Sequence, residues 1–289
     1  MSDDIFDIDD TDDVDLSPQN KAPSNRVDRF KGETGITYRA ALMYFHPLST
    51  SLVLASKRKA RKEGTEVDKA AVKKALDAAL AKRVEEYEVS SVDELAEWQK
   101  LDFRRTQFKK YKSHYKEGVG FVVSRLGKDG EEADKVWGML GDPRDYYTTV
   151  ILVYPTDREG NVEKELLLSR STVKPWRFGR GSFNRLIEVE QKLKNLPGGG
   201  SASLANMDLS LKCTNDKFQN FDIDFASEAI WTKSKKVRDK FLPKAQALYE
   251  KLIDAKEMST QDLRIKLGVG GDSGEDVSDD DVDDFLEGV

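Results

Sequence analysis

Apolar runs and alternating apolar and polar positions predict several β-strands along the chain. The most apolar run, TTVILVY at 148–154, predicts the strongest strand, and GFVVSRL at 120–126 predicts another. MDLSLKC at 207–213 and FDIDF at 221–225 alternate regularly around a polar turn, which predicts a hairpin of two half-buried strands. Further strands are expected at 36–45, 51–55 and 164–169.

A four-residue spacing of apolar side chains predicts a helix at 68–87, in a run rich in Ala, Lys and Glu. The side chains at this spacing are Val72, Leu76, Leu80 and Val84. A capping-box sequence at Ser91 predicts a second helix, which reaches Lys100 and continues to Tyr115 if it includes the basic segment there. Helices are also expected at 181–193 and at 233–255, the latter kinked or restarted at Pro243, and a short helix or turn at 135–147.

The order of these elements predicts an α+β fold, with an OB-fold-like antiparallel β-barrel, a helical insert and a C-terminal helix. We expect one folded domain at 29–267, with the helical insert at about 68–116. The flanking segments 1–28 and 268–289 are polar and rich in acidic residues, a composition that is typical of disordered tails.

The net charge of −6 conceals an uneven distribution of charge. Residues 1–16 contain eight Asp and residues 272–289 contain seven Asp and two Glu, and neither segment contains Lys or Arg. Without these 17 acids, the body of the chain has 36 acidic and 47 basic residues. A basic body of this kind attracts polyanions.

Several classes of protein are disfavoured by the composition. One cysteine, Cys213, cannot form a disulfide within the chain, and with only His46 and His114 as imidazoles we expect neither a metal site nor a cofactor. No apolar run reaches the roughly 18 residues of a membrane span, so we expect a cytoplasmic protein without membrane contact. No phosphate-binding loop with Lys-Ser/Thr is present, and the densest carboxylates lie in the two tails, so we expect a binding protein, not an enzyme.

Two segments, 100–116 and 174–185, interleave basic with aromatic residues, and an aromatic pair enters the strand at 148–154. Single-stranded DNA presents regularly spaced phosphates and unstacked bases, which cations and aromatic rings bind without reading sequence. The candidate DNA-binding residues are Arg104, Arg105, Lys109, Lys110, Tyr111, Lys112, Tyr115, Tyr146, Tyr147, Lys174, Trp176, Arg177, Phe178 and Arg180. A further basic run, at 57–62, precedes the helix at 68–87.

The acidic C-terminus ends in a small apolar pair, which a simple solubilising tail does not need. Its carboxylates could meet basic residues of a partner protein while the apolar pair enters a pocket, and the same carboxylates could compete with DNA. The candidate partner-binding residues are Asp280, Asp281, Asp283, Asp284, Phe285 and Leu286.

The segment 144–183, with its aromatic pair before an apolar strand and its Trp-Arg-Phe-Gly motif before a helix, resembles the core of the single-stranded DNA-binding protein of T-even phages. The segment 208–226 and the Asp-Asp-Phe-Leu terminus resemble that family's following strand pair and partner-binding tail. The resemblance implies an OB-fold core and single-stranded DNA binding in phage replication, recombination and repair. It also implies replisome or recombination partners for the tail.

Two features depart from this family. Its zinc-binding Cys/His subdomain is missing, and an Asp-rich N-terminus replaces the basic arm through which the family self-associates along DNA. The alternative function is RNA binding or transcription accessory activity in a phage, because basic and aromatic residues alone do not distinguish RNA from DNA.

Overall fold

The computed structural model describes residues 29–116, 120–125, 144–157, 159–197, 202–216 and 219–254, with the backbone alone at 112–116, 120–125 and 253–254. The acidic segments expected at 1–28 and 268–289, and most of the helix or turn expected at 135–147, lie outside these residues.

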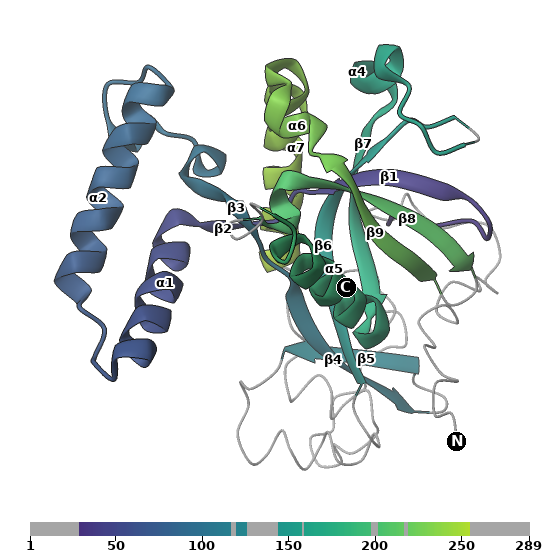
Figure 1. The fold of residues 1–289 in the computed structure, drawn as a ribbon, viewed down its shortest axis with the longest axis horizontal. Helices are drawn as coiled ribbons and strands as arrows, with labels where there is room; N and C mark the ends of the chain where they lie inside the picture. Colours follow the sequence, from purple (N-terminus) through teal and green to yellow (C-terminus); the bar gives the residue numbers. More distant parts are fainter. Residues whose placement is uncertain are drawn as a thin grey trace, which may run out of the picture.

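The described chain combines helices and antiparallel strands, which confirms the α+β class (Figure 1). The strands are β1 (Thr37–Leu42), β2 (Phe45–Pro47), β3 (Leu101–Thr106), β4 (Lys109–Lys116), β5 (Gly120–Arg125), β6 (Arg144–Tyr154), β7 (Thr172–Gly179), β8 (Met207–Asn215) and β9 (Asn220–Glu228). The α-helices are α1 (Leu48–Glu63), α2 (Lys69–Glu86), α4 (Leu167–Arg170), α5 (Arg180–Lys194), α6 (Ile230–Lys233) and α7 (Lys235–Asp254).

Strand β6 is the centre of the main sheet. The sheet follows the order β5-β4-β6-β1-β8-β9, and β7 also pairs with β6. The 11 residues of β6 pair with β4 through their first half and with β1 through their second half. Strands β2 and β3 form a separate two-stranded sheet. Within the described residues the main sheet stays open, so the expected closed barrel is not found there.

Both faces of the main sheet are covered. Alternate residues of β6 enter two apolar cores: Val150 and Leu152 belong to the core beneath α6 and α7, whereas Tyr147 and Ile151 belong to the core beneath α5. Because successive side chains of a strand point to opposite faces, α5 and α7 lie on opposite sides of β6. No helix in the described part of the chain is long and apolar enough to cross a membrane.

The structure corrects three expectations about local structure. Residues 51–55 belong to helix α1, which Gly64 ends in the left-handed conformation at φ 66°. The expected hairpin strand at 164–169 is a 3-10 turn followed by α4, and only an isolated bridge between Thr156 and Val162 remains of the hairpin.

The third correction concerns the expected helix after Ser91. Two short 3-10 turns (Val92–Glu94 and Glu97–Lys100) replace it, and the basic segment that follows forms strands β3 and β4. Strand β3 pairs with β2 and strand β4 pairs with β6, and aromatic residues within both strands favour this conformation. The helical part of the insert is therefore α1 and α2, and 101–116 belongs to the sheets.

Helices α1 and α2 form a hairpin that stands beside the sheets (Figure 1). The predicted helix at 68–87 is confirmed as α2, which Asp68 caps by accepting a hydrogen bond from the amide of Ala71 at 3.0 Å. No side chain of α2 is buried, because its apolar stripe covers α1 without entering either core.

The other expected elements are confirmed with shifted ends. Strands β6, β8 and β9 include the predicted runs, β5 covers residues 120–125 of its run, and α5 covers the helix expected at 181–193. Helix α7 continues through Pro243, and the restart lies earlier, at Ser234 between α6 and α7.

Candidate nucleic-acid interface

The predicted basic and aromatic residues meet on three neighbouring strands. Strand β4 places Tyr111 opposite Tyr146 and Lys110 opposite Tyr147 of β6. On the other edge of β6, Phe178 of β7 lies opposite Tyr147. Segments that are far apart in the sequence therefore come together through strand register alone.

On the face covered by α7, four residues form a group that we call the tyrosine stack: Lys109, Tyr111, Tyr146 and Arg177. The Tyr111 and Tyr146 rings stack with centroids 5.2 Å apart and planes 17° apart. The guanidinium carbon of Arg177 lies 4.1 Å from the Tyr146 centroid, and Lys109 Nζ lies 5.1 Å from the Tyr111 centroid. Cations at these distances are attracted to the negative faces of the rings.

On the face covered by α5, five residues form a second group, the phenylalanine cluster: Phe108, Lys110, Tyr147, Phe178 and Phe183. The Tyr147 and Phe183 rings stack with centroids 3.9 Å apart, and Phe108 meets Phe183 edge to face at 5.7 Å. Lys110 Nζ lies 5.8 Å from the Tyr147 centroid. The same three strands thus carry cations and stacked rings on both faces.

Lys110 also forms an ion pair at the edge of the phenylalanine cluster. Its Nζ lies 2.8 Å from Asp145 Oδ2. The hydrogen bond with this carboxylate raises the pKa of Lys110, so the amine keeps its positive charge. A phosphate that approaches Lys110 must compete with Asp145.

Burial restricts which of these rings a base could reach. Trp176 has no exposed surface, since it packs against Phe30, Phe178 and Phe221 in the core beneath α5. Trp176, a candidate DNA-binding residue, therefore presents no exposed ring face to a base in this structure. Tyr146, Tyr147 and Phe178 are also buried, with 6%, 7% and 2% of their surface exposed.

The rings with accessible surface are those at the margins of the two groups. Tyr111, Phe108 and Phe183 are half-buried. Each rests on a buried aromatic neighbour that fixes its orientation. Phe108 and Phe183 lie in the two interleaved segments, yet sequence reasoning did not select them, because a phenylalanine there is equally compatible with a core.

The other predicted residues lie apart from the two groups. Arg104 and Arg105 belong to β3, in the two-stranded sheet, and Arg104 Nε donates to Asp102 Oδ1 at 3.0 Å. Burial favours the neutral form of Asp102, but hydrogen bonds from the Arg104 side chain and amide lower its pKa overall. This pairing occupies Arg104 with a structural carboxylate.

Lys174 lies on β7 and Arg180 begins α5, and neither belongs to the tyrosine stack or to the phenylalanine cluster. Lys174 is half-buried opposite Ile151, and Arg180 is exposed. The backbone of β4 places Lys112 opposite Asp145 and Tyr115 opposite Phe121, while their side chains lie outside the described part of the chain. The tail residues from Asp280 to Leu286 are also outside it.

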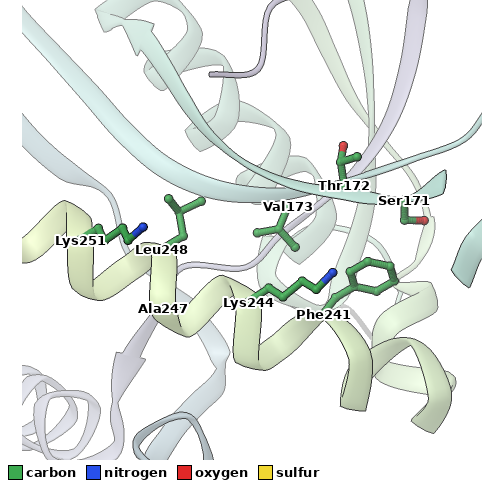
Figure 2. Close-up of a pocket in the computed structure, with 8 residues that line it drawn as sticks. All are labelled: Ser171, Thr172, Val173, Phe241, Lys244, Ala247, Leu248 and Lys251. Atoms are coloured by element: carbon green, nitrogen blue, oxygen red, sulfur yellow. The ribbon is translucent and has the colours of Figure 1, made fainter. Parts of the chain in front are cut away.

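A shallow pocket between α7 and the start of β7 adds two cations that sequence reasoning missed (Figure 2). Lys244 and Lys251 line it and are exposed, beside Val173 and Leu248. Helix α7 then passes the tyrosine stack, where the Tyr111 hydroxyl donates to the Leu252 carbonyl at 3.5 Å. The two lysines are seven residues apart, about two helical turns, so the sequence could have indicated that they share one face of the predicted helix.

The chemistry available at these strands is that of binding: cations for anions and rings for planar groups. Among the described residues, no three His, Cys, Asp or Glu side chains gather in a way that could hold a metal ion. The chain matches no protein-family model, and no curated protein is similar to it in sequence.

Proposed function

We propose that the chain binds single-stranded DNA without strong sequence preference, through the end of the sheet formed by β4, β6 and β7. The tyrosine stack carries this proposal. Its half-buried ring, Tyr111, is the one proposed to meet a base, Lys109 lies 5.1 Å from that ring and is proposed to meet a phosphate, and Tyr146 with Arg177 holds Tyr111 in place. Ring stacking and cation contact together are what non-specific single-strand binding uses.

The resemblance to the T-even phage proteins supports the biological setting. We place the activity in phage DNA replication, recombination and repair, in the cytoplasm of the host cell, as a binding function without catalysis. An OB-like origin of the sheet belongs to this proposal, supported by the way β6 pairs with β1, β4 and β7. The C-terminal acids with Phe285 and Leu286 are proposed to dock replication or recombination proteins and to compete with DNA.

The test replaces Tyr111 with Leu, which keeps apolar bulk and removes the ring. Binding of a labelled mixed-sequence oligonucleotide of about 20 nucleotides should weaken by about 1–3 kcal/mol, the contribution of one stacked base. Tyr111→Phe keeps the ring and should bind close to wild type. Tyr87→Leu is the matched control, because Tyr87 is a half-buried ring that packs on Trp98 at the end of α2.

The ligand class is tested with the same proteins. Duplex DNA should bind more weakly than the single strand of equal length, because its bases are not open to Tyr111. RNA of equal length distinguishes the alternative, and tighter binding of RNA would assign the sheet to RNA. Equal affinities of wild type and Tyr111→Leu for single-stranded DNA would refute the proposed site.

A further inference from the structure

The hairpin of α1 and α2 carries a concentrated positive charge that the sheet site does not use. Its tip, from residue 57 to residue 74, has eight basic and three acidic residues. All eight basic side chains are exposed, and none is in an ion pair within the described part of the chain. They are Lys57, Arg58, Lys59, Arg61, Lys62, Lys69, Lys73 and Lys74.

The charges of α1 gather on its outward face. Leu52, Ser56 and Ala60 follow a four-residue spacing on the covered side of the helix. At 100° per residue, the pairs Lys57/Arg61 and Arg58/Lys62 lie on the opposite side. Like charges four residues apart destabilise a helix, so helix formation does not account for this pattern.

The charges of α2 are placed against the helix dipole. Lys69 begins the helix, Lys73 and Lys74 follow in its first two turns, and no acidic residue lies in the first turn. Cations stabilise the C-terminus of a helix and are unfavourable at its N-terminus. Within α1 this dipole favours only Arg61 and Lys62, which lie in the last turn; it does not explain Lys57 and Arg58, or the lysines at the start of α2.

The chemistry of the tip selects the kind of partner. Residues 48–86 contain no aromatic residue and no histidine, so the hairpin cannot stack on bases. The only large apolar side chains between residues 57 and 74 are Val67 and Val72, and both are half-buried. The tip therefore has little apolar surface on which an apolar pair such as Phe285-Leu286 could pack. Charge without rings or an apolar pocket fits a regular row of phosphates.

We propose that the tip of the α1–α2 hairpin is a second nucleic-acid contact, which binds the phosphate backbone of duplex DNA. In Figure 1 the loop between α1 and α2 lies toward the bottom of the view, as β4 and β5 do. One nucleic acid with a single-stranded and a duplex part could therefore contact both surfaces. The hairpin surface stands on its own charge pattern and does not depend on the single-strand site at Tyr111.

The experiment replaces Lys57, Arg58, Arg61 and Lys62 with Gln, which keeps side-chain length and helix propensity. The matched control replaces four other exposed lysines with Gln: Lys194, Lys233, Lys235 and Lys236. Both variants remove four charges, so long-range attraction falls equally. Circular dichroism and thermal unfolding verify that both remain folded.

The readout is the affinity for a labelled DNA duplex of about 20 base pairs across a salt series. The hairpin variant should bind at least about tenfold more weakly than the control, and its slope of log K against log salt should be shallower by about 0.9 for each phosphate that is no longer neutralised. Equal weakening in both variants would overturn the proposal. It would also be overturned if the hairpin variant bound duplex like wild type but no longer self-associated in sedimentation, which would assign the tip to the acidic tail of another copy.

Failure of this proposal is distinguishable from failure of the proposed function. Tyr111→Leu should weaken single-strand binding and leave duplex binding near wild type, whereas the hairpin variant should do the reverse. If only the hairpin variant has its effect, the single-strand site is wrong and the duplex contact stands.

Discussion

Asp208 is a buried carboxyl group between a strand and a helix. Its Oδ1 accepts a hydrogen bond from the Tyr154 hydroxyl at 3.0 Å, and its Oδ2 accepts one from the Ile230 amide at 3.2 Å. Burial raises the pKa of this carboxyl to about 7, against the hydrogen bonds that stabilise its charged form. The protonated form is therefore favoured in the folded protein far more than in the unfolded chain.

This carboxyl should make stability depend on pH. The folded state binds the proton between about pH 4 and pH 7 while the unfolded state has released it, so stability decreases as pH rises through this window. The loss is about 4 kcal/mol at most, from roughly three pKa units. Asp208→Asn cannot ionise, so it should lack this part of the decrease.

Urea unfolding of both proteins across this pH window measures the effect. The NH2 group of Asn would replace an oxygen that accepts the Ile230 N–H, so the variant should be less stable than wild type at low pH. The difference in unfolding free energy between the two proteins should narrow toward neutral pH. Parallel stability curves for the two proteins would contradict the prediction.

Aromatic residues show what the sequence could and could not predict at single positions. Tyr111, Tyr146, Trp176 and Phe178 were all expected near nucleic acid, and strand register brings them to neighbouring strands. Trp176 and Phe178 are buried because α5 and the segment around Phe30 cover their face of the sheet, and Phe30 lies far from both in the sequence. An aromatic residue beside a cation is compatible with either a core or a binding surface until its covering elements are known.

At the level of elements, the α1–α2 hairpin should contribute less to global stability than the sheet. Leu80 of α2 is half-buried in the helix pair, whereas Leu211 of β8 is fully buried in the core beneath α5. Leu211→Ala should therefore cost about 2–5 kcal/mol, as a buried leucine does, and Leu80→Ala should cost under about 1.5 kcal/mol.

Denaturant unfolding followed by tyrosine and tryptophan emission checks this difference. Hydrogen exchange should agree, with amides of α2 less protected than those of β6. Equal costs for the two substitutions would show that the hairpin and the sheet unfold as one unit.

Elements with a strong local signal were predicted correctly, and those that depend on distant partners were not. Helix α2 is a run of strong helix formers that begins after a capping Asp68, and strand β6 contains a run of β-branched and aromatic residues, so both signals are local. Residues 51–55 form an apolar run that suits a strand or a helix, and the structure places them in α1, which begins after Pro47 and ends at Gly64. The basic segment at 101–116 became strand because β2 and β6 supply partners, which no local pattern reveals.

At the level of the whole molecule, charge was easier to predict than strand order. The separation of acidic ends from a basic body is a property of composition and needs no coordinates. The branching of the sheet at β6 depends instead on pairings between segments that are distant in the sequence, such as β1 with β6. Closure into a barrel was expected from the order of the elements and from the resemblance, but closure also depends on strand tilt and register, which neither reveals.

The acidic C-terminus should compete with DNA for the basic body. Helix α7 brings the chain past Tyr111, through the hydrogen bond with Leu252, before the nine acids of residues 272–289. A polyanion tethered this close has a high effective concentration at the proposed site. Removing residues 272–289 should therefore tighten single-strand binding, most strongly at low salt, where the Debye length is about 30 Å at 0.01 M.

A second variant separates competition with DNA from docking of partners. Replacing Phe285 and Leu286 with Ala keeps every carboxylate, so DNA affinity should stay at the wild-type value at each salt concentration. The same variant should no longer capture replication or recombination proteins in pull-downs from infected cells, because the apolar pair is gone. The eight Asp of residues 1–16 could compete in the same way, so both ends are also removed together. If the protein without both acidic ends binds single strands no more tightly than the intact chain at low salt, then carboxylates do not compete with phosphate here; unchanged pull-downs would assign docking to another surface.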